Sequence, residues 1–156
     1  MWRFRGTPHY LNEQAKRLGI TRNVRFISPV DQDRLADYFR AADLVVVPSY
    51  NESFGLVAIE AQACGTPVVA ANVGGLGTAV RHGESGLLVV GHDPADYAAA
   101  CAQLLENPER LACMGAAARR HAGEFGWGQT AKLTLDVYED AITERWPSRR
   151  RVSSLA

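Results

Sequence analysis

Two glutamates, Glu52 and Glu60, stand eight residues apart around the start of a predicted helix near Gly55. The first amides of a helix have no acceptor within the helix, and the helix dipole is positive at that end. Phe54, Gly55 and Leu56 would therefore offer backbone N–H groups to a phosphate or to sugar hydroxyls, and Gly55 would let a ligand approach the backbone closely. Carboxylates accept hydrogen bonds from sugar diols. The pattern favours a site for a nucleotide sugar.

The spacing of the two glutamates argues against a glycoside hydrolase. Eight residues of uninterrupted helix rise about 12 Å, whereas the carboxylates of a glycosidase stand about 5 to 9 Å apart. Unless the loop folds back, Glu52 and Glu60 cannot flank one glycosidic bond. We expect them to hold two parts of one ligand, with a hexose at one end, ribose hydroxyls at the other and a diphosphate between them.

The elements that position these residues alternate between short apolar runs and helical patterns. Continuous β-branched runs such as 44–47 are typical of parallel strands covered on both faces. The alternation predicts an α/β fold with a Rossmann-like, doubly wound parallel sheet, followed by C-terminal helices. Strands are expected at 24–27, 44–47, 67–70 and 87–90, and helices at about 10–18, 31–42, 55–64, 78–80, 93–106, 107–123 and 127–145, with a polar loop over 72–77.

Length and patterning predict one main domain over residues 9–145. Residues 1–8 lack periodicity and are expected to be irregular, and the tail 146–156, with its three arginines, is expected to be disordered. Ligands of open α/β sheets bind outside the carboxyl ends of the strands, so the loops after these strands are the candidate site.

Composition excludes several function classes. Lys and Arg total 17 and Asp and Glu total 17, so no net charge attracts nucleic acid or an anionic membrane. The apolar runs are too short for a membrane span and no signal peptide opens the chain, so a cytoplasmic protein is expected. Cys64, Cys101 and Cys113 lack metal-ligand spacing and are expected to be small buried thiols.

The segment from Glu52 to Glu60 resembles the E-x7-E signature of retaining glycosyltransferases of the GT-B fold, in the large family that includes sucrose and glycogen synthases. The resemblance covers roughly residues 9–143 and implies the C-terminal, donor-binding domain of such an enzyme. Further residues that carry it are 41–43, 48–49, 65–69, 73–75 and 83–88.

Residues 50–65, together with Gly91-His92-Asp93, more narrowly resemble the D-inositol 3-phosphate glycosyltransferases that begin mycothiol synthesis. That resemblance implies transfer of N-acetylglucosamine from UDP-N-acetylglucosamine to 1D-myo-inositol 3-phosphate, and a homodimer in the full-length enzyme. It implies that Glu60 binds the ribose hydroxyls and that Glu52 lies beside the donor sugar as the catalytic residue. The amides of Phe54, Gly55 and Leu56 would touch sugar and phosphate, and the backbone of Val30 would meet the uracil.

The same resemblance implies a structural magnesium ion. Its ligands would be backbone carbonyls and one hydroxyl, from Phe39, Arg40, Ala42 and Thr66. The family has no settled enzymic nucleophile. Retention is usually explained by front-face attack, in which the departing diphosphate takes the proton of the acceptor hydroxyl while the protein supplies positioning and charge stabilisation.

The family's phosphate-binding Arg and Lys precede the part of the pattern that this chain matches. We therefore expect an N-terminally truncated enzyme that is inactive alone. Two alternatives remain open: a non-catalytic nucleotide-sugar-binding module, and a related transferase of the sucrose-phosphate synthase or mannosyltransferase type.

Several residues have simpler interpretations. Gly74 and Gly75 form either a tight turn or a ligand-side contact. The histidines are expected at the surface or in loops, Trp127 is expected to pack between the last helices, and Arg81 is expected to be a surface residue rather than a phosphate ligand.

Overall fold

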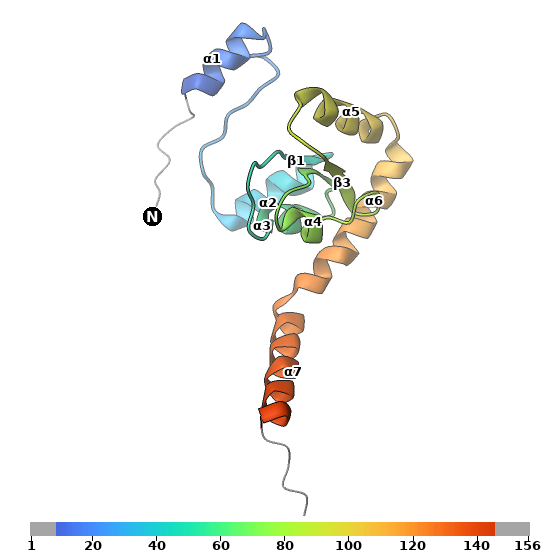
Figure 1. The fold of residues 1–156 in the computed structure, drawn as a ribbon. Coiled ribbons are helices and arrows are strands. Elements are labelled where there is room, and N and C mark those ends of the chain that lie inside the picture. The colour runs from blue at the N-terminus through green and yellow to red at the C-terminus, as the bar shows by residue number, and fades with distance from the viewer. Residues whose placement is uncertain (1–8, 146–156) are drawn as a thin grey trace, which may run out of the picture. The chain divides into compact units, whose positions relative to one another are not determined.

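The computed structural model describes residues 9–145, and the chain divides between Tyr38 and Phe39 into two compact units (Figure 1). The irregular segment expected at 1–8 and the disordered tail expected at 146–156 lie outside the described residues. In residues 9–145 we find no helix with the length and apolarity that crossing a bilayer requires.

The unit that ends at Tyr38 contains α1 (His9–Arg17) and most of α2 (Gln32–Ala41). Gly19 ends the first helix as predicted, with φ of 70° and its N–H on the carbonyl of Lys16 at 3.0 Å. Asp31 caps the second helix, because its Oδ1 accepts from the N–H of Arg34 at 2.9 Å. Local signals therefore place both helices correctly.

The strand predicted at 24–27 is wrong. A strand needs a neighbour to accept and donate its backbone hydrogen bonds, and no described segment pairs with these residues. Val24 and Phe26 instead face Leu11 and Ala15 across a hollow of about 240 Å³ beside α1. The apolar run packs on a helix rather than in a sheet.

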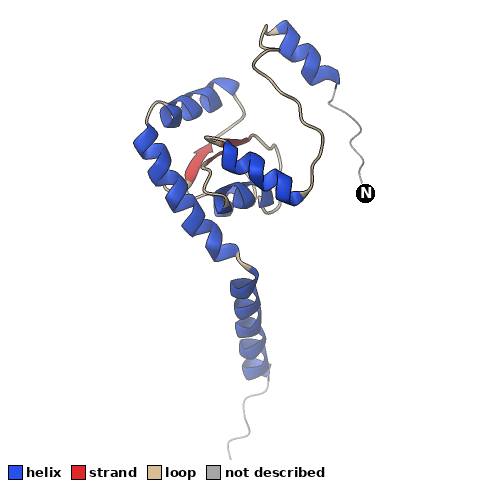
Figure 2. Ribbon diagram, turned by 180° about the vertical axis from the view of Figure 1, so that it is seen from behind, coloured by secondary structure: helices blue, strands red, loops and turns tan. Residues whose placement is uncertain are grey.

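The unit that begins at Phe39 is built on a parallel sheet of three strands, β1 (Val45–Val47), β2 (Val68–Ala71) and β3 (Gly86–Val89), in the order β1-β2-β3 (Figure 2). Val46 pairs with Val69, and Val69 with Leu87. All four residues of β2 are fully buried, so both faces of the central strand are covered. The Rossmann-like α/β prediction is confirmed, with three of the four expected strands.

Helices follow each strand of this unit, and the predicted caps begin two of them. The Asp93 carboxylate accepts from Ala95 N–H at 2.9 Å, and the Asn107 side chain accepts from Arg110 N–H at 2.9 Å. These helices are α3 (Leu56–Ala63), α4 (Leu76–Ala79), α5 (Pro94–Leu105), α6 (Pro108–Ala122), the short 3-10 helix η1 (Gly123–Phe125) and α7 (Trp127–Arg145).

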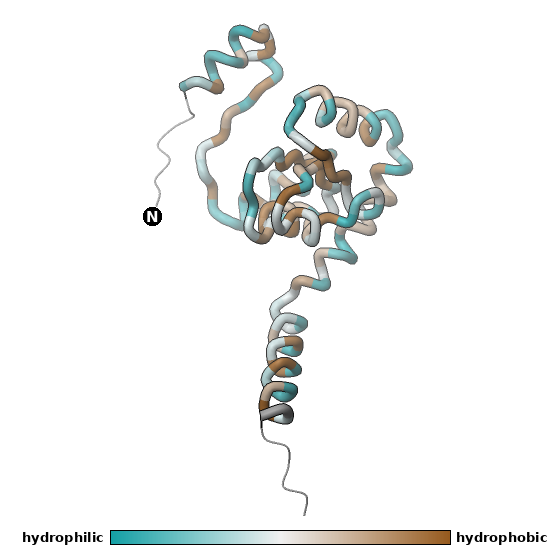
Figure 3. The backbone as a smooth tube through the Cα atoms, viewed as in Figure 1, coloured by the Kyte–Doolittle hydropathy of each residue, from teal (hydrophilic) through white to brown (hydrophobic). Residues whose placement is uncertain are grey.

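The core of this unit lies between the sheet and its helices, where Figure 3 shows the strands as largely hydrophobic. Val68, Leu76 and Leu104 are fully buried there. Two side-chain predictions are wrong. Trp127 is 89% exposed rather than packed between helices, and Cys113 is an exposed free thiol rather than a buried one.

Candidate functional site

The turn between β1 and α3 presents the helix N-terminus that the sequence predicts. Gly55 is buried, has φ of 86°, and precedes the first helical residue, Leu56. The first turn of α3 contains no acidic residue, and its N-cap, Gly55, has no side chain to accept from the first amides. Phe54 and Leu56 are 51% and 60% exposed. This end of α3 is therefore an exposed group of backbone donors with a positive dipole, which suits an anion.

Glu52 lies in the turn and not on the helix. One of its carboxylate oxygens accepts from Gly55 N–H at 3.2 Å, so the loop folds back toward the helix start. Glu60 lies within α3, four residues and about 6 Å of rise beyond Leu56. Both glutamates are half-buried. The separation expected for an uninterrupted helix therefore does not apply, since only part of the segment is helical.

Two glycines in the loop after β2, Gly74 and Gly75, pack against the backbone of this turn. Gly75 N–H donates to the carbonyl of Glu52 at 3.0 Å. A Cβ on Gly75 would lie 2.5 Å from Ser53 O and 2.6 Å from Phe54 Cα. A Cβ on Gly74 would strike the Glu52 carbonyl. The turn that carries Glu52, which we call the glutamate turn, therefore packs directly on the backbone of these two glycines. This contact favours the tight-turn interpretation of the pair.

Gly55 has a packing role that the sequence did not reveal. A Cβ there would lie 3.0 Å from Ala79 Cβ and 3.1 Å from Leu76 Cδ2, so its bare α-carbon faces α4. Gln62 of α3 completes the same contact, because its buried Nε2 donates to Ala79 O at 2.7 Å. The start of α3 is fixed against α4 on one side, which leaves the opposite side of the helix end to a ligand.

An aromatic contact links Phe54 to η1, the 3-10 helix that follows α6. Its ring meets Phe125 edge to face, with centroids 6.1 Å apart, and Phe125 meets His121 in the same way at 5.1 Å. His121 is only 4% exposed, so the prediction that it lies at the surface is wrong. Arg81 donates to both carboxylate oxygens of Glu124, at 2.7 and 2.9 Å. The preferred interpretation of Arg81 as a surface residue therefore agrees with the structure.

The four residues predicted to hold magnesium gather at the end of α2. The buried Thr66 hydroxyl donates to Phe39 O at 2.6 Å, which brings two of the four together. Arg40 and Ala42 follow Phe39 at the carboxyl end of the helix. Within residues 9–145, no group of three or more His, Cys, Asp or Glu side chains is placed to hold a metal ion.

The family described as "Glycosyl transferases group 1" matches residues 6–121. This match covers most of the chain, including both glutamates, the glycine pair and α3. The chain belongs to this family. Family membership agrees with the predicted resemblance.

Relatives with high sequence identity carry one name. A D-inositol 3-phosphate glycosyltransferase 2 of Catenulispora acidiphila is 64% identical over 137 residues, which are 88% of this chain and 32% of that protein. A D-inositol 3-phosphate glycosyltransferase of Thermobispora bispora is 59% identical over 86% of this chain and 32% of that protein. The chain therefore spans about a third of the length of the curated relatives it matches.

Solved glycosyltransferase structures share the fold. A sucrose-phosphate synthase of Thermosynechococcus elongatus superposes with a TM-score of 0.78 at 37% identity, over 86% of this chain and 34% of that one. Anabaena HepE, solved in complex with UDP-glucose, superposes with a TM-score of 0.69 at 31% identity, over 74% of this chain and 31% of that one. Both similarities extend over most of this chain.

Proposed function

We propose that this chain is the donor-binding part of a retaining glycosyltransferase that moves N-acetylglucosamine from UDP-N-acetylglucosamine to 1D-myo-inositol 3-phosphate. The observation that carries the proposal is the start of α3. Gly55 provides no side-chain cap there, the Glu52 carboxylate accepts from Gly55 N–H, and Glu60 lies one turn inside the helix. The names of the relatives support the acceptor, and the HepE complex supports a UDP-sugar donor.

The geometry suggests how the parts of the donor would be divided. Gly55 N–H is already bound by Glu52, so the amides that remain for the diphosphate are those of the first turn of α3, from Leu56 onward. The second carboxylate oxygen of Glu52 would accept from a sugar hydroxyl, and Glu60 would accept from the ribose. Val30 belongs to the other compact unit, and its contact with the uracil stays a prediction.

The catalytic contribution of these residues is positioning and charge stabilisation. The turn would hold the sugar over the helix end, where the positive dipole stabilises the negative charge that grows on the departing diphosphate. In front-face transfer that diphosphate takes the proton of the acceptor hydroxyl, so Glu52 would orient the sugar rather than act as a nucleophile. Cytoplasmic location and a homodimer of the full-length enzyme stay predictions.

We also propose the structural magnesium at the end of α2. Carbonyl oxygens in the last turn of a helix lack the i+4 amide donors of the helix interior, and the dipole is negative there, which favours a cation. Phe39 O accepts from Ala42 N–H at 3.2 Å as well as from the Thr66 hydroxyl. Phe39 O and Thr66 Oγ1 lie 2.6 Å apart, so two oxygen ligands of the kind that magnesium prefers are side by side, and with the carbonyls of Arg40 and Ala42 they would hold the ion.

Calorimetric titration of the 156-residue chain with UDP and with UDP-N-acetylglucosamine tests the donor site. Glu60→Gln removes the charge that would bind the ribose, and we expect both affinities to fall about tenfold or more, as for loss of a charge-assisted hydrogen bond. Glu139→Gln, on the exposed surface of α7, is the matched control. A folded wild-type chain that binds neither ligand, or an unchanged affinity in Glu60→Gln, would contradict the proposal.

UDP-glucose in the same titration addresses the related transferases. A preference for UDP-glucose over UDP-N-acetylglucosamine would move the assignment toward an enzyme that transfers glucose.

A further inference from the structure

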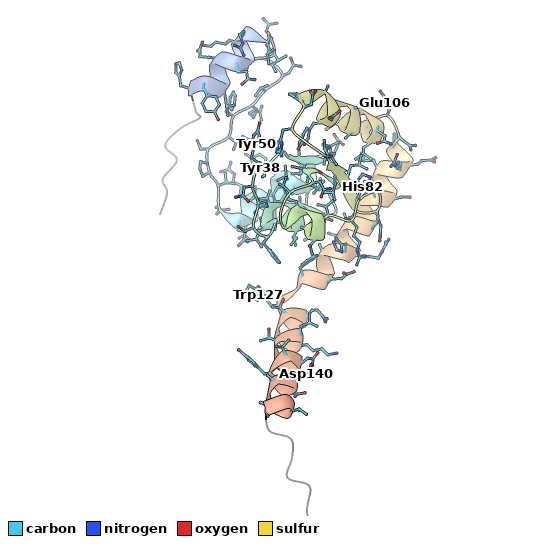
Figure 4. All side chains as sticks on the ribbon, viewed as in Figure 1. Tyr38, Tyr50, His82, Glu106, Trp127 and Asp140 are labelled. Atoms are coloured by element: carbon cyan, nitrogen blue, oxygen red, sulfur yellow. The ribbon has the colours of Figure 1, made fainter. Side chains whose placement is uncertain are left out.

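A stacked pair of side chains joins the loops that follow β1 and β3. The rings of Tyr50 and His92 are parallel within 3°, with centroids 4.0 Å apart (Tyr50 is labelled in Figure 4). β1 and β3 are not neighbours in the sheet, because β2 lies between them. Two strand spacings amount to about 9.6 Å, so the pair must cross the carboxyl end of β2. We call this pair, with its hydrogen bond to Ser49, the Tyr50–His92 latch.

The His92 ring also holds the backbone of the loop after β1. Its Nε2 lies 3.0 Å from the carbonyl oxygen of Ser49. A carbonyl can only accept, so Nε2 carries the hydrogen of this contact. Two successive residues, Ser49 through its carbonyl and Tyr50 through its ring, are thus attached to one imidazole.

The base of the latch is anchored in α5. Tyr97 is 8% exposed, and its hydroxyl donates to the carbonyl of Gly91, the residue before His92, at 3.4 Å. Burial, and secondarily the neighbouring Tyr50 phenol, raise the pKa of Tyr97 above its ordinary 10.0. Its hydroxyl therefore keeps the proton that it donates. The outer end of the latch is exposed by contrast, since Tyr50 is 81% exposed and no other ring contact holds it among the described residues.

The latch acts on the turn that carries Glu52. Downstream of the latch, the carbonyl of Glu52 accepts from Gly75 N–H and its carboxylate accepts from Gly55 N–H. Upstream, the hydrogen bond of Ser49 to His92 is the attachment nearest to the glutamate. Removal of the imidazole would release Ser49 and Tyr50 together, so that the nearest upstream attachment of the turn would be Val47, which pairs with Ala70 in the sheet.

We propose that His92 is a positioning residue for Glu52, and that it makes the site selective for the sugar of the donor over the nucleotide. This inference rests on the proposed function. Glu52 is the residue assigned to the sugar, and it depends on the latch. Glu60, assigned to the ribose, lies inside α3, where the helix backbone sets its position. Loss of the latch should therefore weaken binding of the sugar and leave binding of UDP unchanged.

The test is the ratio of the affinities for UDP-N-acetylglucosamine and UDP, measured calorimetrically on the 156-residue chain. In His92→Ala we expect the ratio to fall about three- to tenfold, with UDP affinity within about twofold of wild type, because a contact is misplaced rather than deleted. The matched control is His82→Ala. His82 Nδ1 accepts from Leu88 N–H of β3 at 2.9 Å. The variant therefore removes an imidazole that contacts β3 but is not part of the latch, and the ratio of its two affinities should equal that of wild type.

Two conservative variants separate the parts of the latch. His92→Phe keeps a ring under Tyr50 but cannot donate to Ser49, whereas His92→Asn can donate to Ser49 but cannot stack. Each should recover part of the lost ratio, which a purely structural role for His92 would not produce. If His92→Ala does not fold, as judged by circular dichroism, His92→Asn and His92→Phe decide the matter by the same ratio.

The stack itself has a spectroscopic signature. A ring 4.0 Å away shifts the His92 side-chain proton resonances upfield, and Tyr50→Leu should return them toward ordinary positions. Wild-type binding of the sugar donor with an unchanged ratio in every His92 variant overturns the latch and leaves the proposed function standing. A folded wild-type chain that binds neither ligand overturns the proposed function, and with it the role of the latch.

Discussion

Substitution of Gly75 by alanine would place a Cβ against the backbone of the glutamate turn. The new Cβ would lie 2.5 Å from Ser53 O and 2.6 Å from Phe54 Cα, whereas ordinary contact begins at 3.4 Å. The turn must therefore retreat by about 0.9 Å, because the atoms it meets are backbone and cannot rotate away. The same retreat breaks the hydrogen bond from Gly75 N–H to the carbonyl of Glu52.

The expected cost in stability of Gly75→Ala follows from these two effects. Overpacking of this kind costs about 1–3 kcal/mol, and a lost backbone hydrogen bond about 1 kcal/mol. The free energy of unfolding should fall by about 2–4 kcal/mol, which for a chain of this size lowers the melting temperature by about 4–16 °C. Donor affinity should fall about tenfold or more, since hydrogen bonds tolerate only a few tenths of an ångström of displacement.

Thermal melting by circular dichroism and calorimetric titration with UDP-N-acetylglucosamine measure both effects of Gly75→Ala. Gly77→Ala is the control, because its Cβ would meet only Asn72 Oδ1, at an ordinary 3.5 Å, and alanine favours the helix α4 in which it lies. A Gly75→Ala chain that melts and binds like wild type would refute the inference that close backbone packing by the loop after β2 sets the position of Glu52.

Two further predictions concern ions and protons. Magnesium chloride should raise the melting temperature of the wild-type chain relative to EDTA and should leave Thr66→Val unaffected, because the variant lacks the hydroxyl ligand; an equal response of both proteins would contradict the metal site. Because the pKa of Tyr97 is raised, the folded chain retains a proton that the unfolded chain loses, so its contribution to stability is complete below pH 10 and declines above it. Urea unfolding between pH 9 and 11 should show a steeper decline for wild type than for Tyr97→Phe, and parallel declines would contradict this cause.

The parts of the fold that the sequence predicts well are those with local causes. Asp93 and Asn107 cap the helices that follow them, and Gly19 ends α1, all within four residues of the group that each one satisfies. The strand at 24–27 fails because a strand is completed by a neighbour, and an apolar run alone carries no information about whether that neighbour is present.

The candidate site was predictable in its residues but not in its support. The glutamates and the helix start are visible as a motif, whereas the contact of Gly75 with Ser53 joins loops that only the sheet brings together. The Tyr50–His92 latch was missed for the same reason, as 42 residues separate its members along the chain. The signal available in advance was that both side chains lie within three residues of the end of a predicted strand, and the carboxyl ends of these strands meet at one edge of a parallel sheet.

β1 pairs with β2 along one side, and none of the other described segments pairs with its second side. An open edge of valines is a surface on which a foreign strand can add, which leads to aggregation. Here the edge is only three residues long, and it is bracketed by the charge of Asp43 and by Pro48, which has no N–H to donate. Runs of about six residues without proline are the ones that nucleate fibrils. Asp43 and Pro48 therefore disfavour the addition of a foreign strand to β1, the strand that leads into the glutamate turn.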